Sequence, residues 1–154
     1  MESREAQEFT RNLEDRLGRR IVWRTFATWY GSNEGIVREY GVYLCTLDDG
    51  SIYLEDFERL PQILGYQIRS RNTPKYEKYS LLLPPGSVRS VSRVVKKQAA
   101  ASCLAASRIP LASAGRLATA LFPIVTQLET EDGRCLYFEL IDHKAFMRAI
   151  GGDN

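Results

Sequence analysis

The sequence lacks the short motifs by which most enzymes are recognised, and it contains a single histidine, His143. It has no G-x-x-x-x-G-K-[ST], no H-E-x-x-H and no G-x-S-x-G. Nucleophilic catalysis by a cysteine would need a base nearby, and His143 is the one candidate histidine. We therefore expect no catalytic residue, no metal site and no cofactor, and we expect the chain to act by binding.

Cysteine is scarce as well. The three cysteines, Cys45, Cys103 and Cys135, are far apart and form no C-x-x-C pair. A disulfide framework needs an even and dense set. Cys45 and Cys135 lie among apolar residues, where a reduced thiol behaves as a small hydrophobic side chain. The pattern predicts a reducing compartment, and we expect a cytoplasmic protein.

Long apolar runs are also missing. The first residues, MESREAQEFTRNLEDRLG, contain no apolar core of a secretory signal. The most apolar stretches are AAASCLAAS and LATALFPIV, and Arg108 and Arg116 lie between them. A bilayer span needs about 20 apolar residues. We expect no integral membrane segment.

What is present is typical of one globular domain over residues 1–154. The chain is 44% hydrophobic and 26% charged, with a net charge of +2. We divide it into an N-terminal helix (1–18), the first strands (20–96), an alanine-rich insertion (97–120), and a final hairpin with a capping helix (121–150).

The two ends of the chain have helical patterns. Residues 3–17 are amphipathic, with Ser3 and Gly18 as the expected caps. At the other end, Asp142 is a good N-cap. His143, Phe146, Met147 and Ile150 then follow at i, i+3, i+4 and i+7, before Gly151-Gly152. The final stretch therefore predicts a strand that feeds a closing helix, with His143 packed or at the rim.

Strands and hairpins dominate between these helices. RRIVWRTFATWY, IVREYGVYLCTL and SIYLEDFE are rich in β-branched and aromatic residues. In the first strand we expect one shared face, made of Ile21, Trp23, Ala27 and Trp29. Asp49-Gly50 and Asp132-Gly133 predict two-residue type I′ hairpin turns. We expect Glu131 and Arg134 to form an ion pair beside the second turn.

The middle of the chain is less regular. We expect a weak strand at 64–70, a polar loop at 71–75, a strand at 76–83, and a bulged strand in SVRSVSRVV. Residues 98–120 contain nine alanines; their first half favours a helix, and Pro110 and Gly115 break the second half. We interpret this segment as an inserted and mobile excursion.

The charged residues give two candidate sites. The acidic group is Asp48, Asp49, Glu55, Asp56 and Glu58; it lacks calcium-loop spacing, and we interpret it as a solvated hairpin tip. Residues 67–97 hold eight basic side chains against Glu77 alone, interleaved with tyrosines. Such a strip predicts binding of phosphate groups, as in a phospholipid head group or nucleic acid. It consists of Arg69, Arg71, Lys75, Lys78, Arg89, Arg93, Lys96 and Lys97.

Together these elements predict a mainly β (α+β) protein, with a small antiparallel barrel or orthogonal sandwich plugged by the last helix. TLDDGSIYLEDFE, YSLLLPPGSVRSVSRV and DGRCLYFELIDHKAFMRAI resemble bacterial pleckstrin-homology-like (PH-like) and GRAM-type domains. The resemblance covers residues 20–150 without 97–120, and it implies a PH-like adaptor. Phosphoinositide-binding members carry a basic first hairpin, whereas WYGSNEGIVREY has Glu34 and Glu39 beside Arg38.

Three alternatives stay open. LGRRIVWRT and the two strands after it are similar to an Sm-like barrel, which would bind nucleic acid through residues 69–97. Arg16 and Arg20 fit the R-x-x-x-R of the cyclic-di-GMP-binding PilZ family, although Leu54 replaces the glycine of its second motif. A structural subunit that forms a homo-oligomer is the third. We expect a non-catalytic module that binds either a protein partner or an anionic ligand.

Overall fold

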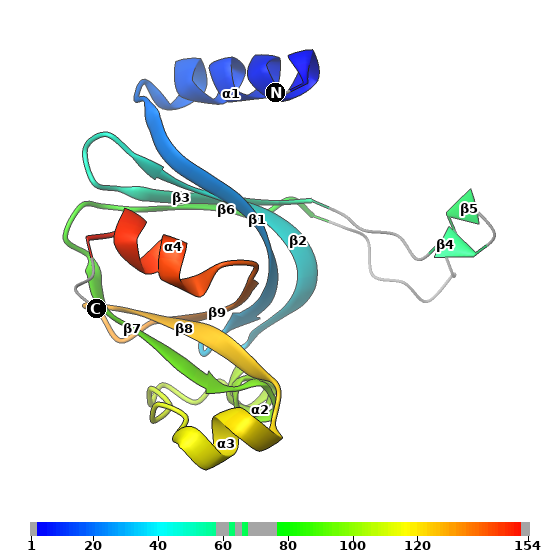
Figure 1. Cartoon of the computed structure of the whole chain (residues 1–154), viewed down its shortest axis with the longest axis vertical. Coiled ribbons are helices and arrows are strands. Elements are labelled where there is room, and N and C mark those ends of the chain that lie inside the picture. Colours follow the sequence, from blue (N-terminus) through cyan, green and yellow to red (C-terminus); the bar gives the residue numbers. More distant parts are fainter. Residues whose placement is uncertain (1–2, 58–61, 64–65, 68–76, 152–154) are drawn as a thin grey trace.

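The computed structural model describes residues 3–57, 62–63, 66–67 and 77–151, and their main element is one seven-stranded antiparallel sheet. Its strands are β1 (Ile21–Ser32), β2 (Ile36–Leu47), β3 (Ile52–Phe57), β6 (Ser80–Leu83), β7 (Val88–Val95), β8 (Ile124–Thr130) and β9 (Cys135–Leu140). Their order is β6-β3-β2-β1-β9-β8-β7. The sheet curls into a half-barrel (Figure 1), which confirms the predicted fold class.

Four helices accompany the sheet: α1 (Arg4–Leu17), α2 (Lys96–Ala105), α3 (Arg116–Leu121) and α4 (His143–Ala149). A two-stranded pair, β4 (Gln62–Ile63) with β5 (Tyr66–Gln67), completes the described elements. The predicted strand at 64–70 and loop at 71–75 lie almost wholly outside the described residues. None of the described helices is long and apolar enough to cross a bilayer.

Helix α4 lies inside the curl of the sheet (Figure 1), as the closing helix was predicted to do. Asp142 caps it by accepting a hydrogen bond from the Ala145 amide at 2.9 Å. Phe146 is fully buried in the largest core cluster, and its ring lies 5.8 Å from that of Trp23. A short amphipathic helix thus fills the space that the curled sheet leaves open.

Two further clusters lie between the sheet and the other helices. Leu13 of α1 packs on Tyr43, Cys45 and neighbouring residues. Ala99 and Cys103 of α2 pack on a separate cluster that includes Tyr137. The second half of β2 and the first four residues of β9 therefore bury successive side chains on both faces of the sheet.

Strand β1 bends because its register shifts twice. One shift lies between Ile21 and Trp23, and it turns Ile21 toward the α1 cluster. The predicted single face for Ile21, Trp23, Ala27 and Trp29 is therefore wrong for Ile21. The second shift lies between Trp29 and Gly31, where a Cβ would stand 2.0 Å from the Ile36 carbonyl oxygen and φ is +136°. Only glycine fits this bend.

Both Asp-Gly hairpins form, but with a different turn from the one predicted. Leu47 N–H donates to the Ser51 carbonyl at 2.9 Å, and Thr130 N–H donates to the Arg134 carbonyl at 2.8 Å. Each loop therefore has three residues, and the glycine alone has a positive φ: +87° at Gly50 and +86° at Gly133. This is a type I turn with a bulged glycine, which needs one left-handed residue where type I′ needs two.

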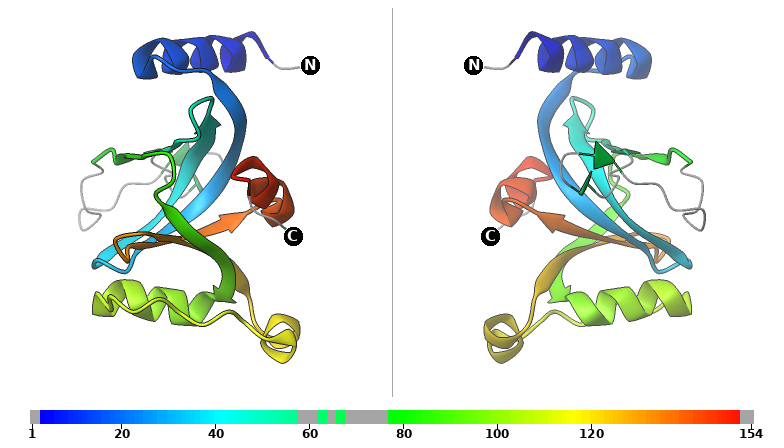
Figure 2. Two further views of the ribbon diagram at one scale, coloured as in Figure 1. Left: turned by 90° about the vertical axis from the view of Figure 1, so that its left-hand side faces the viewer. Right: turned by 90° about the vertical axis from the view of Figure 1, so that its right-hand side faces the viewer.

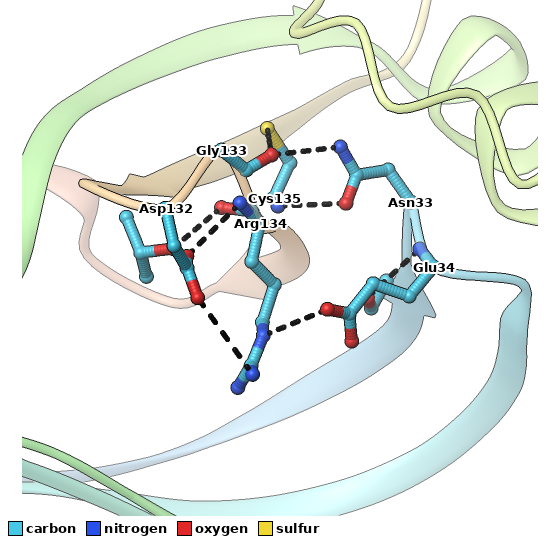
Figure 3. A network of polar contacts seen from close by, with 8 residues as sticks. Asn33, Glu34, Asp132, Gly133, Arg134 and Cys135 are labelled. Atoms are coloured by element: carbon cyan, nitrogen blue, oxygen red, sulfur yellow. Dashed lines mark hydrogen bonds and ion pairs between the residues drawn. The ribbon is translucent and has the colours of Figure 1, made fainter.

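A polar network joins the β1–β2 turn to the β8–β9 turn (Figure 3). The buried Asn33 side chain accepts from the Cys135 amide at 2.9 Å and donates to the Gly133 carbonyl at 3.2 Å. Arg134 Nε donates to Glu34 at 3.2 Å, and Arg134 Nη2 lies 3.9 Å from Asp132. The predicted Glu131–Arg134 pair is therefore wrong: the arginine turns toward Glu34 and Asp132.

Strand β7 has its register shift between Val88 and Ser90, so its predicted bulge is confirmed. The preceding strand begins at Ser80, later than the predicted 76. Just before it, Tyr79 exchanges two hydrogen bonds with Asp56, and its ring lies 4.8 Å from the ring of Trp29. Residue 79 is thus held against the sheet by contacts outside the regular strand.

Candidate interaction surface

His143 is a packed residue at the start of α4. Its Nδ1 lies 2.8 Å from the Thr126 hydroxyl, and burial lowers its pKa, with a further lowering by Arg93 that Asp142 opposes. Among the described residues, no three His, Cys, Asp or Glu side chains gather as metal ligands would. The position matches the predicted packed or rim histidine.

All three cysteines are buried and unpaired. Burial raises the pKa of the Cys45 thiol to about 12, and it raises those of Cys103 and Cys135 to about 11. At neutral pH each sulfur is therefore a protonated thiol, which is a poor nucleophile. The thiols act as small core side chains.

The prediction of a solvated hairpin tip is confirmed for Asp48 and Asp49, which are exposed at the β2–β3 turn, and it is wrong for Glu55 and Asp56. Glu55 and Asp56 are both buried, and they take their partners from different elements. Burial by itself would raise the pKa of Glu55, but hydrogen bonds from Lys78 and Arg16 outweigh it and lower that pKa. Asp56 pairs with Arg38 at 3.1 Å. Glu58 lies outside the described residues. The two buried carboxylates tie α1 and residues 77–79 to the sheet.

Five of the eight basic residues of the predicted strip can be placed, because Arg69, Arg71 and Lys75 lie outside the described residues. Lys78 pairs with Glu55 near α1. Arg89 lies 3.8 Å from Glu129. These two cations already have carboxylate partners within the chain, which reduces the charge they present to a ligand.

The other three members of the strip lie around the start of α2. The charge of Arg93 on β7 helps to lower the pKa of His143. The Lys96 ammonium lies 4.7 Å from the centre of the Tyr30 ring. Lys97 follows it in the first turn of α2. Lys96 and Lys97 are the first residues of a segment that forms a different surface.

That surface is formed by the segment predicted to be an inserted excursion. The segment packs on the sheet: Ala99 and Cys103 are buried, and Gln127 holds Leu111 through two hydrogen bonds of 2.9 and 3.0 Å. Part of the predicted excursion therefore packs on the sheet, and its mobility stays a prediction. Its helical first half is confirmed, although α2 begins at Lys96.

The outward side of the same segment is apolar. Five large side chains are strongly exposed: Leu104 by 75%, Ile109 by 73%, Leu117 by 74%, Leu121 by 65% and Phe122 by 49%. Arg108 and Arg116 are exposed among them. We call these seven residues the α2–α3 face. Figures 1 and 2 place α2 and α3 at the end of the molecule opposite α1, and Figure 2 shows them on two sides of that end.

Within the sequence of this segment, the charged side chains have one sign. From Lys96 to Leu128 the sequence contains four cations, Lys96, Lys97, Arg108 and Arg116, and no acidic residue. Leu117 and Leu121 are spaced i, i+4 and share one side of α3. In α2, apolar residues lie on both the buried and the exposed sides, which is unusual for a helix that faces water. The face is both apolar and cationic.

Sequence reasoning missed this face, although one signal was present. The predicted basic strip ended at Lys97. The absence of acidic residues over about the next thirty positions was not used as a sign of a binding surface. Exposure could not be read from the sequence, because an alanine-rich helix has no polar side to mark the direction of solvent.

The described surface also has hollows elsewhere. One of about 410 Å³ lies where β9 ends beside β1, and it is lined by Phe26, Thr28 and Ile141, among others. Another of about 290 Å³ lies between α1 and the sheet, where Phe9 and Phe26 meet Tyr43 with ring centres 5.1 and 5.5 Å apart. None of their lining residues belongs to the α2–α3 face.

The fold and this surface define a curled antiparallel half-barrel with flanking helices and an apolar, cationic end. Comparisons with protein-family models, curated proteins and solved structures found no match to the chain.

Proposed function

We propose that this chain is a PH-like binding module without catalytic activity, and that it docks an anionic partner through the α2–α3 face. The single observation that carries the proposal is the exposure of five large apolar side chains within a stretch that has cations and no acids. Exposed apolar patches, especially those rimmed by polar residues, mark interaction sites in soluble proteins.

The architecture supports the PH-like part of the proposal. Strand β1 pairs with both β2 and the last strand, β9, and a C-terminal helix occupies the curl of the sheet. This arrangement is compatible with the PH-like resemblance of the sequence. The half-barrel then serves as a rigid scaffold on which α2 and α3 are an added surface.

The β1–β2 turn is a poor alternative docking site. Asn33 and Glu34 are both engaged by the β8–β9 hairpin, and Glu34 adds a negative charge. A head group bound there would have to compete with these contacts. The α2–α3 face has no such internal competitor among the described residues, because Arg108 and Arg116 form no ion pair with them.

Site-specific crosslinking in the native cell tests this proposal. A photoreactive residue at Leu117 should give a defined crosslinked product, whether with a protein or a lipid. The same residue at Val22, which is 68% exposed on β1, is the matched control and should give none. The Arg108→Glu and Arg116→Glu pair should reduce the yield at Leu117. Equal labelling from both positions, or none from either, refutes docking through this face.

A further inference from the structure

We propose that the partner of the α2–α3 face is an anionic membrane surface, into which Leu104, Ile109, Leu117, Leu121 and Phe122 insert. This inference rests on the proposed function and names the chemistry of the partner. A segment that lies in the membrane interface combines leucine and phenylalanine on one side with cations that contact lipid head groups. Leu117, Leu121 and Phe122 with Arg116 supply this combination within seven residues.

The charge of the face selects against a second copy of the chain. In a two-fold dimer the same patch faces itself. Arg108 and Arg116 of both copies would then lie in one interface, and no acidic residue between Lys96 and Leu128 would compensate for the repulsion. An anionic surface meets the same cations with the opposite sign, and cations near such a surface are attracted within about a Debye length.

The composition of the face favours lipid over a protein groove. The hollows described above lie elsewhere on the surface. Leucine is under-represented among the residues that dominate protein–protein affinity, and those residues act in well-packed central pockets. A fluid bilayer needs no complementary shape. It needs projecting apolar side chains, which Leu104, Ile109 and Leu117 provide with about three quarters of their surface exposed.

The location of the face is suitable for such contact. Helices α2 and α3 both lie at the end of the molecule that is opposite α1 (Figures 1 and 2). Ala99 and Cys103 fix the inward side of α2, and the Gln127–Leu111 hydrogen bonds hold the segment between the two helices. Insertion would therefore need no unfolding of the half-barrel, and the rest of the surface would stay in water.

Vesicle sedimentation with the whole chain tests the inference. The protein should bind vesicles of phosphatidylcholine with about one third phosphatidylserine, and it should bind phosphatidylcholine vesicles at least about fivefold more weakly. The Leu117→Glu and Leu121→Glu pair should lower the partition coefficient on the anionic vesicles by about tenfold or more. The Arg108→Glu and Arg116→Glu pair should remove the preference for anionic lipid.

Two controls separate the face from general surface effects. Val22→Glu with Ile141→Glu changes two other strongly exposed apolar residues and should leave binding unchanged. Circular dichroism and thermal unfolding should confirm that every variant is folded. In a Phe122→Trp variant, tryptophan emission should shift to the blue on anionic vesicles, which reports insertion directly. A binding defect in the control pair equal to that of the leucine pair overturns the inference.

The remaining outcomes distinguish this inference from the proposed function. If anionic vesicles do not bind, but Leu117 still crosslinks to a protein in the cell, the lipid partner is refuted and docking through the face stands. If neither experiment gives a signal, both are refuted. Equal binding to neutral and anionic vesicles also overturns the inference, because the cations would then have no role.

Discussion

The substitution Phe146→Ala tests whether α4 is what holds the curled sheet in place. Phe146 has no exposed surface, and it belongs to the largest core cluster together with residues from β1, β2, β3, β8 and β9. Its ring also contacts that of Trp23 on β1. No other residue of α4 is fully buried, so this side chain carries most of the contact between the helix and the sheet.

The expected loss in the free energy of unfolding is large compared with the total stability of an ordinary domain. Truncation of a buried phenylalanine to alanine costs about 3–5 kcal/mol, as transfer free energy plus the cavity that remains. A typical domain has about 5–15 kcal/mol in total. For a chain of this length, each kcal/mol shifts the melting temperature by about 2–4 °C. Phe146→Ala should therefore lower the melting temperature by about 10 °C.

Thermal and urea unfolding, followed by circular dichroism and by the fluorescence of Trp23 and Trp29, measures this loss. Lys144→Ala is the matched control, because Lys144 is an exposed residue of the same helix and should change stability by less than about 0.5 kcal/mol. If Phe146→Ala lowers the free energy of unfolding by less than about 1 kcal/mol, or by no more than the control does, α4 does not support the sheet.

Three further outcomes follow from the structure. Asn33→Ala should destabilise the fold by about 2–3 kcal/mol in urea unfolding, because it leaves the Cys135 amide without its partner, whereas an unchanged midpoint would contradict the role of this network. Burial lowers the pKa of His143 from 6.5, so that as the pH falls the unfolded chain is protonated at this residue before the folded chain is. The free energy of unfolding should therefore decrease as the pH drops below 6.5. His143→Gln should flatten that dependence in thermal unfolding measured over a pH series. The three thiols should react with a maleimide only after unfolding, since burial raises all their pKa values, and fast labelling of the native protein would disprove this.

Local signals in the sequence were enough to predict most of the elements. Ser3, Gly18 and Asp142 cap their helices as expected, because capping depends on a few neighbouring residues. The hairpins were also found, but their turn type was not. An Asp-Gly pair fits either a two-residue loop or a three-residue loop, and the register that decides between them is set by how β2 meets β3 and β8 meets β9.

Errors arose where the deciding contact comes from a distant part of the chain. Alternation placed Glu55 and Asp56 on opposite faces of one strand, and it could not show that both are buried. Their partners, Arg16 on α1 and Arg38 on β2, are 39 and 18 residues away. A carboxylate with a hydrogen-bonded cation can be buried where a lone one cannot. The fate of these charges therefore depended on the tertiary fold.

The strongest argument for a functional α2–α3 face comes from comparing the two helices that cover the outside of the same sheet. Helix α1 buries Leu13 and presents to solvent mostly charged and amide side chains, such as Glu8, Arg11 and Asp15. Helix α2 buries Ala99 and Cys103 in the same way, yet it exposes Leu104, and its neighbour α3 exposes Leu117 and Leu121. Because each helix already buries its own side chains against the sheet, the fold does not require these exposed leucines, and a surface that the fold does not require is best explained by what binds to it.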